Sequence, residues 1–114
     1  MKERRKHHRK HLAFYTRIFD RDTGQLLGHL DNLTIEGVMI ICNEPIETQK
    51  VYHLHMDLPD QGFGKAHLDF DAMSKYCQPD INPRFYNAGF QFVSISPRDI
   101  AIIESIVKAY RIRD

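Results

Sequence analysis

The hydrophobic pattern of this chain changes its period near residue 96, and that change limits the folds open to it. Up to residue 95, apolar residues occur at alternate positions or in short runs separated by turn-forming clusters, which is typical of β-strands. After residue 96, apolar residues recur with the spacing of one helix face. Strands followed by one helix predict a mainly β domain and fit an antiparallel barrel.

The strand predictions rest on alternation between apolar and polar positions. In residues 51–58, Leu54 and Met56 fall on the apolar face, which we expect to be the inner one. In residues 25–33, the same alternation places Leu30 and Asn32 on one face. The predicted strands are residues 12–19, 25–33, 38–42, 51–58, 66–77 and 85–95.

The last segment has the features of a helix start. Ser96 is a capping residue, Pro97 fits the first turn, and Asp99 lies where a capping box has its acid. The expected helix has about four turns and an apolar face that covers one end of the β structure; a partner-binding or dimerising helix is the alternative. The apolar face consists of Ile100, Ile103, Ile106, Val107 and Tyr110.

Length and composition predict one soluble domain. The chain has 114 residues, of which 42% are hydrophobic and 27% charged, so a modest core is expected. No apolar run approaches the roughly 18 residues of a membrane span, and the basic start lacks the apolar region of a secretory signal. Cys42 and Cys77 do not form a C-x-x-C pair, so we expect reduced thiols in a cytoplasmic protein.

The net charge of +1 is unevenly distributed. In the first 12 residues, six basic side chains against Glu3 give +5, which leaves −4 for the rest of the chain. We therefore expect two parts: a flexible basic N-terminal arm over residues 1–11, and a β domain with its helix over residues 12–114. The basic side chains are Lys2, Arg4, Arg5, Lys6, Arg9 and Lys10.

Two short motifs carry the candidate binding chemistry. The first has the pattern R-R-x-x-x-R and begins at Arg4; the second has the pattern [D/N]-x-[S/T]-x-x-G and runs from Asn32 to Gly37. Arginine presents fork-shaped donors that match phosphate oxygens and the O6/N7 edge of guanine. The second motif supplies a short amide, a hydroxyl and a glycine turn. Together they predict a site for a small, anionic, guanine-bearing ligand.

This pair of motifs, in this order, resembles the signature of PilZ domains, receptors for the bacterial second messenger cyclic di-GMP. Residues 89–93, a glycine followed by an aromatic residue, also resemble a late strand of that family. The resemblance covers most of the chain. It implies a six-stranded antiparallel β-barrel with a C-terminal α-helix, and an arginine-bearing arm that wraps over ligand docked beside the second motif.

Site residues follow from the resemblance position by position. Family members most often have serine where Thr34 stands, and the extra methyl is expected to lower affinity without abolishing binding. Arg5 and Arg9 match the two arginines of the family's R-x-x-x-R motif. Arg4, immediately before them, implies two stacked ligands per protomer, and Tyr76 is a candidate stacking surface. The predicted ligand-binding residues are Arg4, Arg5, Arg9, Asn32, Thr34 and Gly37; we predict no catalytic residue, metal ligand or cofactor.

The sequence gives little support for metal binding or catalysis. His53 and His55 share a strand face but lack a third ligand at usable spacing, so no metal site is predicted. The chain has no phosphate-binding loop and no nucleophile elbow, so an enzyme is not expected.

The predicted function is a cytoplasmic bacterial cyclic di-GMP receptor, monomeric or weakly dimeric, that signals through an unidentified effector protein and binds no DNA. Two alternatives stay open. One is an interaction module of the same fold that binds no nucleotide. The other is a small RNA-binding protein that uses the basic arm, with a steep dependence on salt.

Overall fold

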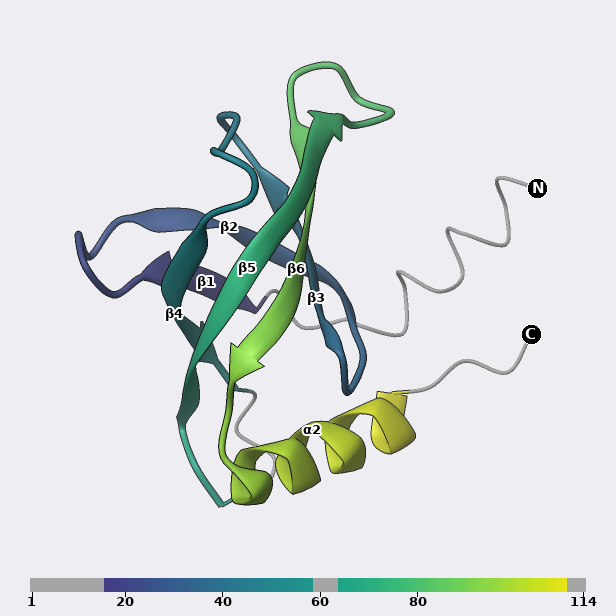
Figure 1. Ribbon diagram of the computed structural model, residues 1–114. Coiled ribbons are helices and arrows are strands. Elements are labelled where there is room, and N and C mark those ends of the chain that lie inside the picture. The colour runs from purple at the N-terminus through teal and green to yellow at the C-terminus, as the bar shows by residue number, and fades with distance from the viewer. Residues whose placement is uncertain (1–15, 59–63, 111–114) are drawn as a thin grey trace.

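Six strands form a closed ring, in a computed structural model that describes residues 16–58 and 64–110. Each strand is hydrogen-bonded antiparallel to two neighbours, in the order β1-β2-β3-β6-β5-β4 (Figure 1). The predicted fold class is confirmed. The elements are β1 (Arg17–Asp20), β2 (Leu26–Leu33), β3 (Gly37–Cys42), β4 (Val51–Asp57), β5 (His67–Pro79), β6 (Tyr86–Ser94) and α2 (Pro97–Tyr110).

The predicted strand boundaries agree closely with the observed ones. Five of the six agree within two residues at each end. The exception is the strand predicted over 12–19: residues 12–15 lie outside the described residues, and the observed strand begins at Arg17. The predicted arm over residues 1–11 also lies outside the described residues, so its separation from the barrel stays a prediction.

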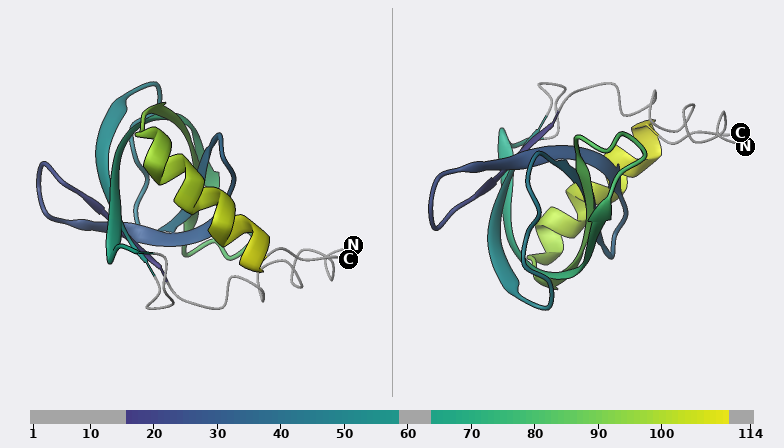
Figure 2. Two further views of the ribbon diagram at one scale, coloured as in Figure 1. Left: turned by 90° about the horizontal axis from the view of Figure 1, so that it is seen from below. Right: turned by 90° about the horizontal axis from the view of Figure 1, so that it is seen from above.

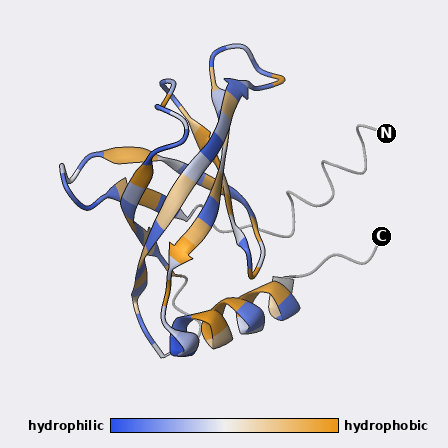
Figure 3. Ribbon diagram, in the orientation of Figure 1, coloured by the Kyte–Doolittle hydropathy of each residue, from blue (hydrophilic) through white to orange (hydrophobic). Residues whose placement is uncertain are grey.

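The barrel interior is filled by the apolar positions of the alternating strands. On β4, Leu54 and Met56 are buried; on the neighbouring β5, Leu68 and Phe70 are buried, while the residues between them face outward. Figure 3 shows the strands changing between hydrophobic and hydrophilic residues along their length. Burial of each such side chain stabilises the fold by about 1.5–3 kcal/mol relative to exposure.

Helix α2 lies across one end of the barrel (Figure 2). Its start is capped as predicted, because Ser96 Oγ accepts a hydrogen bond from the Asp99 amide at 3.1 Å. Asp99 itself pairs with Lys65 Nζ at 3.0 Å and is nearly buried. Ile103 and Ile106 join the core, so the helix has the covering role expected from its pattern. Of the helices in the described ranges, none is long and apolar enough to cross a membrane.

One face assignment from the sequence is wrong. Alternation along β2 placed Asn32 beside Leu30, but Leu30 and Leu33 are both buried while Asn32 is exposed. The pairing of β2 with β3 shifts register between Leu30 and Asn32, which marks a β-bulge. The extra residue reverses the alternation, so that Asn32 points away from the core and becomes available at the surface.

Candidate functional site

The turn between β2 and β3 is built around one hydroxyl. Thr34 Oγ1 accepts hydrogen bonds from the backbone amides of Glu36, at 3.0 Å, and Gly37, at 3.3 Å. The Thr34 amide in turn donates to the carbonyl of Gly37 at 3.0 Å. A serine or threonine is therefore needed to organise this turn, whatever else it contacts. The Thr34 hydroxyl also donates weakly to the carbonyl of Gly37, at 3.5 Å, so its hydrogen bonds lie within the turn.

Gly37 is required by a close approach between two strands. A Cβ at this position would overlap the carbonyl oxygen of Phe90 on β6. Its φ angle is not in the left-handed region, so of the two roles expected for a glycine here, close backbone approach is the one that applies. The motif glycine therefore allows the start of β3 to lie tightly against β6.

Next to this turn the surface is hollowed, with a volume of about 310 Å³. The three predicted residues of the second motif, Asn32, Thr34 and Gly37, all line the hollow. They come from the end of β2, the turn and the start of β3, while β5 and β6 supply the other side. The remaining lining residues are Glu36, Val38, Met39, Lys75, Tyr76, Gly89, Phe90 and Gln91. We call this feature the β2–β3 hollow.

An aromatic ring forms one wall of the β2–β3 hollow. Tyr76 of β5 lies directly over Gly89 of β6, where a Cβ would overlap the ring. The Tyr76 hydroxyl donates to Asn87 Oδ1 at 3.4 Å, and 37% of the residue stays exposed. Burial, with a smaller contribution from Asp31, raises the pKa of Tyr76, so its hydroxyl is neutral near pH 7. The ring is anchored at its polar tip and partly open to a ligand.

A second bulge exposes this ring. Ser74, two residues before Tyr76 on β5, is fully buried, so simple alternation would bury Tyr76 as well. The pairing with β6 shifts register between Ser74 and Tyr76, and the ring turns outward. The Tyr76 ring and Asn32 thus reach the same hollow through separate irregularities in the barrel.

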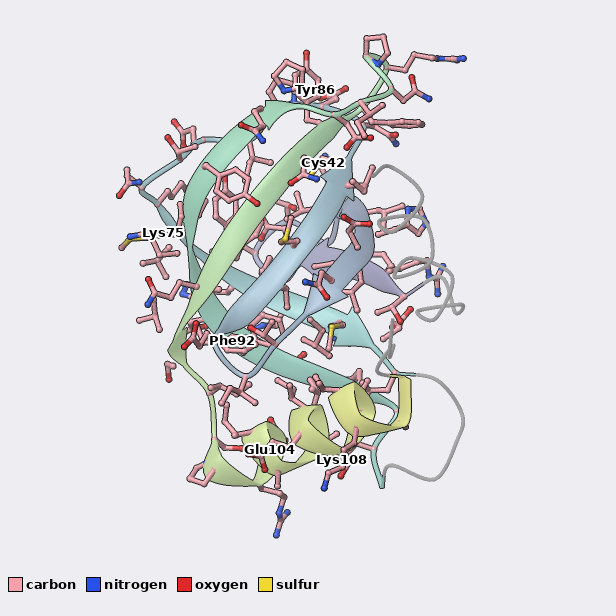
Figure 4. All side chains as sticks on the ribbon, turned by 90° about the vertical axis from the view of Figure 1, so that its right-hand side faces the viewer. Cys42, Lys75, Tyr86, Phe92, Glu104 and Lys108 are labelled. Carbon is pink, nitrogen blue, oxygen red and sulfur yellow. The ribbon has the colours of Figure 1, made fainter. Side chains whose placement is uncertain are left out.

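The charge inside the hollow is small. Its described ionisable lining residues are Lys75, Glu36 and the neutral Tyr76, so one positive and one negative side chain face the space. Lys75 projects outward from the barrel (Figure 4). The sequence reading did not select Lys75, Met39 or Gln91, because only the register of β3, β5 and β6 brings them to the hollow. Arg4, Arg5 and Arg9 lie outside the described residues.

The fold and this site define a small antiparallel β-barrel with a helix across one end and a hydrogen-bonding turn at the rim of a surface hollow. A family model for the PilZ domain matches residues 3–109, and the chain belongs to the PilZ domain family. The resemblance noted in the sequence is thereby confirmed. Among curated proteins, none matches the sequence closely enough to count as a relative.

Among the solved structures that share the fold are the following two. The Bacillus subtilis inhibitor of motility MotI, also called DgrA, superposes with a TM-score of 0.65 at 11% identity, over 82% of this chain and 45% of that one. The chain therefore spans less than half of MotI. The PilZ domain of YcgR from Escherichia coli, solved with cyclic di-GMP, gives a TM-score of 0.57 at 15% identity, over 86% and 88% of the two chains.

Proposed function

We propose that this protein is a cyclic di-GMP receptor whose ligand occupies the β2–β3 hollow. The observation that carries the proposal is the meeting of Asn32, Thr34 and Gly37 at one hollow of ligand size, beside a partly exposed tyrosine ring. Membership of the PilZ family and the fold shared with a cyclic di-GMP-bound domain support it.

In the proposed site, the hollow and the arm would contact different parts of the ligand. Asn32 offers one acceptor and two donors to a guanine edge, and the Tyr76 ring offers a stacking face. The hollow itself has almost no net positive charge, whereas cyclic di-GMP carries two phosphates. Arg5 and Arg9, with Arg4 before them, would bring the cationic forks that phosphate and guanine require. The site would thus be completed by two distant segments of one chain.

We propose that ligand binding signals by changing the shape and charge of the barrel surface beside the hollow. Ligand would draw residues 2–11 against the barrel beside the hollow, and an effector protein would read the altered shape and charge. Threonine at position 34 is compatible with this role, since its hydroxyl is used mainly within the turn. The proposal implies a cytoplasmic location in a bacterium and a regulatory rather than catalytic function.

Calorimetric titration of the full chain with cyclic di-GMP tests the proposal, with GTP and a short RNA as controls. Saturable binding of one or two ligands per protomer, with much weaker binding of both controls, is expected. No binding of any of the three would favour an interaction module that reads no nucleotide. Preference for RNA, with a steep salt dependence, would favour the nucleic-acid alternative.

A further inference from the structure

Away from the hollow, two histidines and two aspartates form a square on the outer face of β4 and β5. His55 lies directly opposite Asp69 in the strand pairing, and Asp57 lies opposite His67. Their neighbours along each strand are buried in the core, so all four side chains point outward. We call these four residues the β4–β5 cluster. The two histidines of the cluster come from different strands: His55 from β4 and His67 from β5.

The polar atoms of this cluster converge on one carboxylate. His55 Nδ1 lies 2.9 Å from Asp69 Oδ1, and His67 Nε2 lies 4.0 Å from Asp69 Oδ2. One candidate ligand atom from each of these three residues lies within 4.8 Å of the others. A tetrahedral zinc ion holds its N and O ligands at roughly 2.0–2.2 Å and therefore about 3.4 Å apart. The observed separations bracket that value, and the more exposed side chains of His67 and Asp69 can adjust to it.

The two imidazole rings are already arranged side by side. Their centroids are 4.4 Å apart, and the ring planes differ by 28°. Phe19 of β1 packs its edge against His55, with centroids 5.9 Å apart and planes at 71°. The contact limits rotation of the His55 ring and keeps it beside that of His67. Both rings stand next to Asp69 before any ion is bound.

Charge balance distinguishes Asp69 from the aspartates beside it. Arg17 pairs with Asp57 at 3.0 Å, and Arg21 pairs with Asp71 at 2.8 Å. For Asp69, the described ion-pair partners are the two histidines, which carry charge only when protonated. With neutral imidazoles, one uncompensated carboxylate lies between two nitrogen donors. A divalent cation would neutralise this carboxylate and accept the lone pairs of both imidazole nitrogens.

We propose that the β4–β5 cluster binds a zinc-class divalent ion through His55, His67 and Asp69, with water in the fourth position. Asp57 keeps its arginine partner and orients the far nitrogen of His55, which lies 3.4 Å from its carboxylate. Imidazole and carboxylate donors suit zinc, and three protein ligands leave an open position. The site involves a different face of the barrel from the β2–β3 hollow and does not depend on nucleotide binding.

The test is titration of the full chain with Zn²⁺ against a chromophoric chelator. Because the arm contains His7, His8 and His11, the reference protein carries all three replaced by asparagine. A one-to-one complex should remain in this reference. Substituting Asp69→Asn or His67→Asn should weaken it at least about ten-fold, since loss of even a partner of a ligand costs about 10- to 100-fold.

His53→Asn is the matched control. His53 lies on the same outer strand face, but its Nδ1 is 3.0 Å from Asp22, outside the cluster. Its loss should leave zinc affinity within about two-fold, well below the ten-fold effect expected for a ligand. Titration with Co²⁺ gives a second readout, because a four-coordinate complex has strong visible absorption that the Asp69→Asn protein should lack. Circular dichroism verifies that each variant is folded.

Two results would overturn the site. One is disappearance of zinc binding when the arm histidines are replaced, which would assign it to the arm. The other is unchanged zinc affinity in folded Asp69→Asn and His67→Asn proteins, which would reduce the cluster to a cross-strand ion-pair network. Asp69→Asn should still bind cyclic di-GMP like the parent, so failure of the receptor proposal would be seen separately.

Discussion

The β2–β3 hollow and the β4–β5 cluster lie on the same barrel but differ in shape, charge and hydrogen-bond partners. The hollow is concave and nearly neutral, and its key hydrogen bonds lie between one hydroxyl and the backbone of its own turn. The cluster lies on the outer face and is densely charged, with its groups paired across neighbouring strands. The hollow offers shape without charge, whereas the cluster offers charge with little enclosure.

This difference indicates what each surface needs from outside. An anionic ligand in the hollow must be held by cations that the described barrel does not supply there, so the arm becomes part of the proposed site. In the cluster, Asp57 is compensated by Arg17, whereas Asp69 has only the two histidines as described partners and lacks a permanent cation. Substitutions at one surface should therefore leave the other unaffected.

The largest effect is expected from the arm arginines. If the proposed site is right, Arg5→Ala and Arg9→Ala should each weaken cyclic di-GMP binding by about 1–3 kcal/mol, because each would remove a bidentate contact. The double variant should lose less than the sum, since both side chains hold one ligand. Calorimetry measures all three proteins. Lys2→Ala, which changes the arm charge outside the motif, is the control, and parental affinity in the double variant would place the ligand elsewhere.

Thr34→Val should destabilise the turn by about 1–2 kcal/mol. The substitution keeps the shape of the side chain but leaves the amides of Glu36 and Gly37 without their acceptor. Urea denaturation gives the change in free energy of unfolding, and cyclic di-GMP affinity should fall with it. Thr34→Ser retains the hydroxyl, so its stability should match that of the parent, and its cyclic di-GMP affinity should equal or exceed that of the parent because the methyl group is gone. Equal stability of the valine and serine variants would show that the hydroxyl does not organise the turn.

Asn32→Ala should weaken cyclic di-GMP binding about ten-fold, or roughly 1.4 kcal/mol. It removes donors and an acceptor at the rim of the hollow while leaving net charge and core packing untouched. Titration at two salt concentrations separates the alternatives. A mutant with normal affinity and a steep salt dependence would indicate charge-driven nucleic-acid binding rather than a receptor.

The smallest effect is expected at the charged surface. Arg17→Gln should change the free energy of unfolding by only about 0.2–1 kcal/mol, because the Arg17–Asp57 pair is largely open to solvent. Cyclic di-GMP affinity should not change. Thermal unfolding and calorimetry provide the two measurements. A loss of nucleotide affinity here would show that the two surfaces are coupled, contrary to their separation on the barrel.

The strands and the helix could be predicted because they depend on patterns among residues that are close together in the sequence. Alternation in β4 and β5 predicted the inner face, and Ser96 and Pro97 predicted the start of α2. The site was only half predictable. Asn32 and Tyr76 were predicted as candidates, but the bulges that expose them cannot be recognised from the alternation of apolar and polar residues. The pairing of His55 with Asp69 depends on strand register, which single-strand spacing does not reveal.

Closure of the barrel limits how any partner protein could bind to it. Because each strand of the described barrel is hydrogen-bonded to a neighbour on both sides, a partner is not expected to attach by adding a strand of its own to this sheet. Recognition has to use side chains, turns or α2, all of which can change without altering the hydrogen bonds of the barrel. The same closure removes the exposed edges through which β-proteins aggregate. A protein of this design can therefore acquire new partners while its framework stays fixed.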